Sequence, residues 1–305
     1  MSAITSKDFT PLPKERDMTD VIVRPSVSYW KDVFRRIRSD KVAVVSFTFI
    51  LLISLMAIFA PIVCQYGYDT TSMGQGNLSP SSEHWFGTDS LGRDLFARTC
   101  IGARVSLLVA LCCTCVQIVV GSIYGGVMAY FGGKVDALMM RIIEVMMSLP
   151  YLLVVIIVML VLGNSIFGLL VALCVTSWCN TARAVRGVVL QLKTSEYVMA
   201  ARTLGASPAR VIAKHLLPNT MSILILNTAT SIPNYIFQES TLSFLGMGLQ
   251  PPDTSLGVLI SLGQAAMEFY PSQLVFPAVI LVLIVLSFNL LGDGLRDALD
   301  PKLRK

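Results

Sequence analysis

Long apolar segments recur along the chain, and six of them are long enough to cross a lipid bilayer. A helix needs about 20 mostly apolar residues to span the hydrocarbon core. The turn-forming residues Gly163, Asn164 and Ser165 divide one longer apolar run into two spans. The expected fold class is therefore an all-α integral membrane protein with six transmembrane helices. The predicted spans are residues 42–63, 105–131, 142–162, 166–182, 218–240 and 271–292.

The segments outside these spans are not uniform. They comprise residues 1–41, 64–104, 183–217, 246–270 and 293–305. The segment 64–104 is long enough to be more than a connector. Within 246–270, a mildly apolar stretch is too short to span and is expected to dip into the membrane interface. Before the first span, an amphipathic helix lying in the headgroup plane is predicted by the i, i+3, i+4, i+7 spacing of Trp30, Val33, Phe34 and Ile37.

The distribution of Lys and Arg predicts the orientation of the spans. Of the 24 basic residues, nine precede the first span, two lie between the second and third, six lie between Arg183 and Lys214, and four follow the last span. Only Arg93, Arg98 and Arg104 occupy the alternate loops. Because cytoplasmic loops carry the excess of Lys and Arg, we expect both termini and the segment 183–217 to be cytoplasmic.

Composition supports a membrane protein and excludes a water-soluble one. The chain is 54% hydrophobic and only 14% charged, with a net charge of +5. Such a sequence lacks the polar side chains needed to cover its apolar surface. The first 41 residues contain no apolar core typical of a cleavable signal peptide, so the first span is expected to remain as an anchor. The lipid membrane is an expected partner, and nucleic acid is not.

The sequence offers no catalytic constellation, and no enzyme activity is expected. The two histidines, His84 and His215, cannot form a histidine-based zinc site, and no metal site is predicted. The Gly132-Gly133-Lys134 triplet lacks the other positions of a phosphate-binding loop. No nucleotide cofactor is therefore expected on this chain, and a partner must hydrolyse ATP if transport is ATP-driven. Cys64 and Cys100 flank the first extracytoplasmic segment, and a disulfide between them is an open possibility.

Few ionisable residues fall inside the predicted spans. Arg141 and Glu144 lie one turn apart, which indicates an interfacial ion pair. Glu239 follows Asn234 and Gln238 near the outer end of the fifth span. These three residues are candidates for a translocation path. The alternative is that Glu239 simply faces the water outside the membrane. Proline in the spans permits kinks, and Gly121-x-x-x-Gly125 permits close helix approach.

The segment 183–217 has the pattern of two short helices joined by a turn. Ser195 and Glu196 are suited to begin the first helix, and Gly205 to end it in a left-handed conformation. Ser207 and Pro208 then begin a second helix. Its apolar side is formed by Val211, Ile212, Leu216 and Leu217, and Pro218 is expected to end it. The result is a rigid docking element rather than a simple connector.

The residues of this segment carry a family resemblance. Residues 196–205 read Glu-Tyr-Val-Met-Ala-Ala-Arg-Thr-Leu-Gly and are followed by Ile212 and Leu217-Pro218-Asn219. This pattern resembles the EAA loop of the membrane subunits of bacterial ABC importers, with Tyr197 where the motif's name suggests alanine. Residues 85–94, 242–246 and 292–301 resemble the dipeptide/oligopeptide permease branch, and the tail resembles its second, C-type membrane subunit in an oligopeptide transport system.

The resemblance implies a type I ABC importer permease fold (MetI-like) with a core permease domain at 100–293. It implies a heterodimer with a homologous permease subunit in the bacterial plasma membrane, two ATPase subunits that bind ATP and Mg²⁺, an extracytoplasmic peptide-binding protein and a peptide substrate. The implied ATPase-coupling residues are Glu196, Ala200, Ala201, Arg202, Gly205, Ser207, Pro208, Ile212, Leu217 and Pro218.

Two alternative functions remain open from the sequence. One is an ABC permease of the same family for dipeptides, nickel or another solute. The other is a self-sufficient secondary transporter that uses Glu239 and the polar residues around it. A membrane-bound enzyme or receptor has no recognisable site in this chain.

Overall fold

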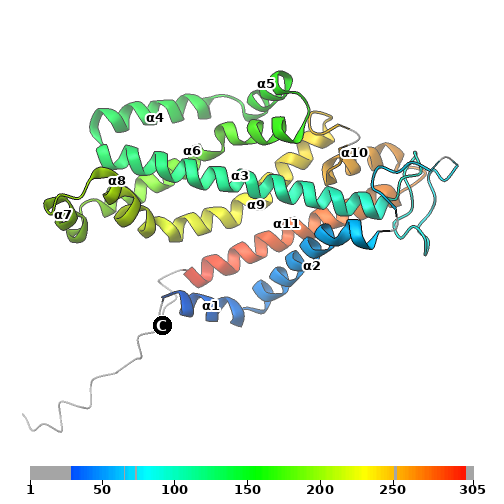
Figure 1. The fold of residues 1–305 in the computed structure, drawn as a ribbon, viewed down its shortest axis with the longest axis horizontal. Coiled ribbons are helices and arrows are strands. Elements are labelled where there is room, and N and C mark those ends of the chain that lie inside the picture. Colours follow the sequence, from blue (N-terminus) through cyan, green and yellow to red (C-terminus); the bar gives the residue numbers. More distant parts are fainter. Residues whose placement is uncertain (1–28, 65, 73, 251–252, 300–305) are drawn as a thin grey trace, which may run out of the picture.

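Helices make up the architecture of the described part of the chain. The computed structural model describes residues 29–64, 66–72, 74–250 and 253–299, and these residues contain no β-strand beyond one isolated bridge between Thr88 and Asp94. The longer helices lie side by side in one elongated bundle (Figure 1). The α-helices are α1 (Tyr29–Ser39), α2 (Lys41–Val63), α3 (Leu95–Phe131), α4 (Gly133–Ser148), α5 (Tyr151–Leu162), α6 (Ile166–Leu192), α7 (Glu196–Thr203), α8 (Pro208–Arg210), α9 (Met221–Phe244), α10 (Leu256–Ala266) and α11 (Ser272–Leu299).

Four of the described helices are long and apolar enough to cross a membrane: α2, α3, α6 and α11. A fifth crossing results if α4 and α5 together count as one bent span. Helix α9 has the length of a span but not the apolar composition, because polar residues recur along it. The structure therefore supports an all-helical multi-spanning protein, and the number six stays a prediction.

The predicted third span, residues 142–162, is not one straight helix. The chain bends by 86° between α4 and α5. Proline explains the break, since Pro150 has no N–H to donate and disfavours a helical conformation in the preceding residue. Leu149 accordingly has an extended backbone, with ψ 135°. Pro150 therefore separates two helices instead of kinking one.

Several helices extend beyond the predicted span boundaries. Helix α3 begins at Leu95, where the Asp94 carboxylate accepts a hydrogen bond from the Ala97 N–H at 2.7 Å. Its 37 residues measure about 55 Å, well above the roughly 30 Å of the hydrocarbon core. Helix α6 continues to Leu192, and α11 continues into the predicted tail as far as Leu299.

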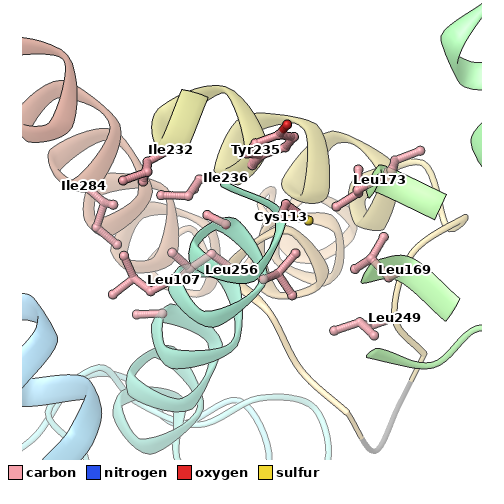
Figure 2. Close-up of a cluster of buried hydrophobic side chains, with 14 of the residues drawn as sticks. Leu107, Cys113, Leu169, Leu173, Ile232, Tyr235, Ile236, Leu249, Leu256 and Ile284 are labelled. Carbon is pink, nitrogen blue, oxygen red and sulfur yellow. The ribbon is translucent and has the colours of Figure 1, made fainter. Parts of the chain in front are cut away.

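Close contact between α3 and α6 forms the centre of the bundle. A Cβ atom on Gly121 would lie 2.8 Å from Cβ of Thr181, and one on Gly125 would collide with the carbonyl oxygen of Ala182. The predicted close approach through these two glycines is confirmed. Beside this contact, a buried cluster joins α3 and α6 to α9, α10 and α11, with Leu107, Leu173, Ile236 and Leu256 among its members (Figure 2).

The described parts of the two segments predicted on the extracytoplasmic side, residues 64–104 and 246–270, are folded against the bundle. Helix α10 packs against α3, α9 and α11, and a Cβ on Gly257 would lie 2.5 Å from Cα of Ser240. In the first segment, Asp89 accepts a bond from Arg93 Nε at 2.7 Å, and the buried Arg98 lies 3.6 Å from the same carboxylate. Gln273 of α11 donates to the Thr88 carbonyl oxygen at 3.0 Å, which fixes this segment to the bundle.

Other predictions outside the bundle's centre can be checked directly. Cys64 and Cys100 are free thiols. The ion pair between Arg141 and Glu144 is present at 2.9 Å and exposed. Helix α1 forms as predicted, and Val33 on its apolar face packs beside the end of α11 and the start of α9. The side chain of Trp30 and residues 1–28 lie outside the described part of the chain.

We expect Gly125→Val to lower the melting temperature of the purified protein in detergent. The added carbons would collide with the α6 backbone, and overpacking of this kind costs about 1–3 kcal/mol. Gly187→Val is the matched control, because a Cβ on Gly187 meets no atom within 4 Å. Equal melting temperatures for the two variants would contradict the close contact.

We also expect Asp89→Asn to destabilise the outer segment. The amide keeps the shape of the carboxylate but leaves Arg93 and Arg98 without their counter-charge, and breaking a buried ion pair costs about 3–5 kcal/mol. Limited proteolysis would measure the loss as faster cleavage between residues 66 and 94. Asp69→Asn, at an exposed aspartate in the same segment, is expected to leave the cleavage rate unchanged.

Candidate functional site: a helical projection and a polar cavity

A short helical projection, residues 196–220, connects α6 to α9 at one end of the bundle (Figure 1). Helix α7 forms its first half. Gly205 follows α7 with φ +80°, and the Ala206 N–H donates to the Ala201 carbonyl oxygen at 3.0 Å. The predicted left-handed turn at Gly205 is therefore present, and it reverses the chain after α7.

The start of α7 differs from the prediction in one respect. Ser195 occupies the position before the helix, but its side chain makes no capping bond. Its hydroxyl instead donates to the Leu192 carbonyl oxygen, at 2.5 Å. The hydroxyl therefore closes the end of α6 rather than the beginning of α7. Glu196 still places its carboxylate in the first turn of α7, where the helix dipole favours it.

The second half of the projection begins as predicted but does not end at Pro218. Ser207 accepts from the Arg210 N–H at 3.4 Å, and Pro208 is the first residue of α8. A π-helical segment, η2 (Val211–Leu216), and a 3₁₀ segment, η3 (Leu217–Thr220), then lead directly into α9. The change to 3₁₀ geometry places Pro218 near the start of a new helical segment, where its missing N–H is tolerated.

Apolar packing seats the projection on the bundle. Val198, Val211 and Leu216 are fully buried with Ala129 of α3 and Val185 of α6. Ile212 is buried in the same cluster, and Leu217 is half-buried against it. The guanidinium of Arg202 lies 4.5 Å from the ring centroid of Tyr130, a cation–π contact that ties α7 to the end of α3.

The outer surface of the projection is accessible. Ala201 is half-buried, and Leu204 is 87% exposed at the turn. Two basic residues of the same projection, Arg210 of α8 and Lys214 of η2, are also exposed. Seven residues of the predicted coupling set are exposed: Glu196, Ala200, Arg202, Gly205, Ser207, Pro208 and Pro218.

A polar cavity of about 330 Å³ lies between α3, α5, α6 and α9. Twelve of its fourteen lining residues are polar. The spacing is helical: on α6 and on α9 the lining positions recur every three or four residues, so each helix presents one polar face. The lining residues are Gln117, Tyr151, Leu173, Thr176, Ser177, Asn180, Thr181, Ala184, Asn227, Thr230, Ser231, Asn234, Tyr235 and Gln238.

Hydrogen bonds between side chains fix the walls of this cavity. Gln117 Nε2 donates to Thr181 Oγ1 at 2.7 Å and to Ser231 Oγ at 3.0 Å, and its Oε1 accepts from the Tyr235 hydroxyl at 2.6 Å. One glutamine thus links α3 to α6 and α9. On the other side, the Tyr151 hydroxyl of α5 donates to Gln238 Oε1 of α9 at 2.7 Å.

The three predicted path residues separate in the structure. Asn234 and Gln238 line the cavity, whereas Glu239 does not. The Glu239 carboxylate is fully buried and accepts hydrogen bonds from the hydroxyls of Ser106 at 2.6 Å and Ser243 at 2.9 Å. It therefore meets neither the cavity nor outer water, and it links α9 to α3.

Most of the cavity wall was absent from the sequence prediction. Gln117 and Tyr151 are isolated polar residues in apolar segments and give no periodic signal. The polar face of α6 did give one, since Thr176, Asn180 and Ala184 recur at helical spacing. Small and polar residues repeated on one face of a membrane helix indicate contact with protein or water rather than lipid.

Comparison with known proteins identifies the family. Residues 117–305 match the family model described as "Binding-protein-dependent transport system inner membrane component", and residues 28–80 match the "N-terminal TM domain of oligopeptide transport permease C". The first match covers more than half of the chain.

Several relatives are similar over nearly their whole length. An oligopeptide transport system permease protein of Bacillus subtilis is 44% identical over 305 residues, 100% of both chains. A dipeptide transport system permease protein of the same species is 47% identical, over 94% of this chain and 90% of the relative. An oligopeptide transport system permease protein of Escherichia coli is 43% identical, over 90% and 92%. The chain therefore belongs to the family of inner membrane components of binding-protein-dependent transport systems, the permease subunits of ABC importers.

Proposed function

We propose that this chain is the C-type permease subunit of an oligopeptide ABC importer. The observation that carries this proposal is the similarity to an oligopeptide permease over the full length of both chains, combined with the polar cavity inside the bundle. The cavity forms this subunit's half of the translocation path, and a homologous permease subunit supplies the other half. The chain itself carries out no catalysis.

The membrane arrangement follows from charge and contacts. Six spans are formed by α2, α3, the bent α4–α5 pair, α6, α9 and α11. An even number of spans places both termini on the same side of the membrane, which we assign to the cytoplasm. The excess of Lys and Arg supports this orientation. It is also supported by the packing of Val33 beside Leu299 and Ile225, since this contact gathers α1, the end of α11 and the start of α9 at the end of the bundle that bears the projection.

The projection transmits motion from the ATPases to the path. Two ATPase subunits bind ATP and Mg²⁺, and one of them receives residues 196–217 in a surface groove. The exposed side chains of Leu204, Arg210 and Lys214 provide contact surface, while the buried Val198, Val211 and Leu216 make the projection move with α3 and α6. An extracytoplasmic peptide-binding protein delivers the peptide to the other face of the membrane.

A dipeptide substrate is the second candidate, because a dipeptide permease is 47% identical to this chain. To distinguish the two substrates, dipeptides and longer peptides are compared as competitors for uptake by the assembled transporter. The better competitor identifies the preferred substrate.

We expect Gly205→Val to abolish peptide uptake while membrane insertion and ATPase binding persist. A β-branched residue at φ +80° costs about 1–2 kcal/mol and reorients the second half of the projection, although nothing lies within 4 Å of the added carbon. Gly246→Val is the matched control, since Gly246 has φ +76° with equally open space and lies outside the projection. Gly205→Asn is expected to restore uptake in part, because asparagine tolerates this conformation. Normal uptake by Gly205→Val would contradict the coupling role.

We expect the purified chain, reconstituted alone, to transport no peptide. Proteoliposomes that contain only this chain and carry a proton or sodium gradient should accumulate no labelled peptide, whereas the complete complex should accumulate it on addition of ATP. Gradient-driven flux through the chain alone would favour a secondary transporter instead.

A further inference from the structure

The wall of the polar cavity carries hydrogen-bonding groups without charge. None of the described residues that line it is an Asp, Glu, Lys, Arg or His. The carboxylate that is adjacent in sequence, Glu239, is turned into the helix interface and satisfied by serine hydroxyls. The polar side-chain groups that a substrate meets in this cavity are therefore amides and hydroxyls only.

Three asparagine amides in the wall are available to a ligand. Asn180 and Asn234 are exposed, Asn227 is half-buried, and none of the three makes a side-chain hydrogen bond to a described residue. The glutamines differ, because Gln117 and Gln238 are engaged by neighbouring side chains. An asparagine side chain both donates and accepts hydrogen bonds, which matches the N–H and C=O groups of a peptide main chain.

The spacing of two of these amides matches an extended peptide. Asn227 and Asn234 are seven residues apart on α9, which places them on one face and about 10 Å apart along the helix axis. An extended chain advances about 3.3 Å per residue, so three residues of peptide cover this distance. Asn180 approaches the same cavity from α6.

Neutrality has a direct consequence for selectivity. A fixed charge in a wall of low dielectric constant interacts strongly with charged side chains, attracting one sign and repelling the other. An amide wall leaves side chains of either sign equally acceptable, while the main chain is common to every peptide.

We propose that Asn180, Asn227 and Asn234 bind the main chain of the transported peptide, and that this half of the path does not select for side-chain charge. This inference rests on the proposed peptide-import function and names the groups that carry it out.

The test uses the complete transporter, purified through a tag on this chain and reconstituted with its external binding protein. ATP-driven uptake of Ala-Ala-Ala, Ala-Lys-Ala and Ala-Glu-Ala is measured for the unaltered protein and for variants. Because the same binding protein delivers all three peptides, a change in their uptake ratio between variants reports on the path alone.

Asn234→Leu, which keeps the size of the side chain and suits a membrane helix, is expected to lower uptake of all three peptides by the same factor. Asn180→Asp is expected to raise the ratio of Ala-Lys-Ala to Ala-Glu-Ala uptake about fivefold or more, and Asn180→Lys to lower it similarly. The same charges at Gln191, exposed at the end of α6 and outside the cavity, are expected to leave the ratio unchanged.

An unchanged ratio in both charged Asn180 variants, or undiminished uptake by Asn234→Leu, would overturn the inference while peptide import itself stands. Absence of uptake of every peptide by the unaltered complex would overturn the proposed function, and this inference with it.

Discussion

The contact between α3 and α6 through Gly121 and Gly125 is the constraint on which the rest of the structure depends. Gln117, one turn before the two glycines on α3, donates to Thr181 of α6 and positions the cavity wall. Ala129, one turn after the glycines on α3, and Val185 of α6 form the surface on which the projection packs. The same helix pair therefore holds both the cavity and the projection, and a rotation of either helix displaces the two together.

Sequence alone predicted the features that depend on local backbone chemistry. Gly205 occupies the left-handed turn because few other residues adopt it readily, and Ser207 with Pro208 begins a helix for equally local reasons. The Ser195 hydroxyl had two acceptable uses, and the choice between them depends on where α6 ends. The passage through Pro218 depends on a change from π to 3₁₀ geometry after the buried Leu216, which no local rule specifies.

Part of the cavity wall is predictable from the sequence, also through a local pattern. Asn234 and Gln238 belong to a polar stripe on α9 that includes Asn227 and Ser231, and helical periodicity identifies that stripe. Glu239 lies one residue beyond Gln238, which rotates it by 100° around the helix and directs it toward Ser106 of α3. The role of an isolated polar residue such as Gln117 becomes apparent only from its contacts with the neighbouring helices.

The buried Glu239 also bears on the order in which the helices can pack. Helix α9 combines this carboxylate with a polar stripe, and it does not reach the hydropathy of the other long helices. A free carboxylate is costly in lipid, whereas Ser106 and Ser243 satisfy it in the folded bundle. The two partners, Ser106 of α3 and Glu239 of α9, lie 133 residues apart in the chain, so the bond that satisfies the carboxylate can form only after both helices have been synthesised.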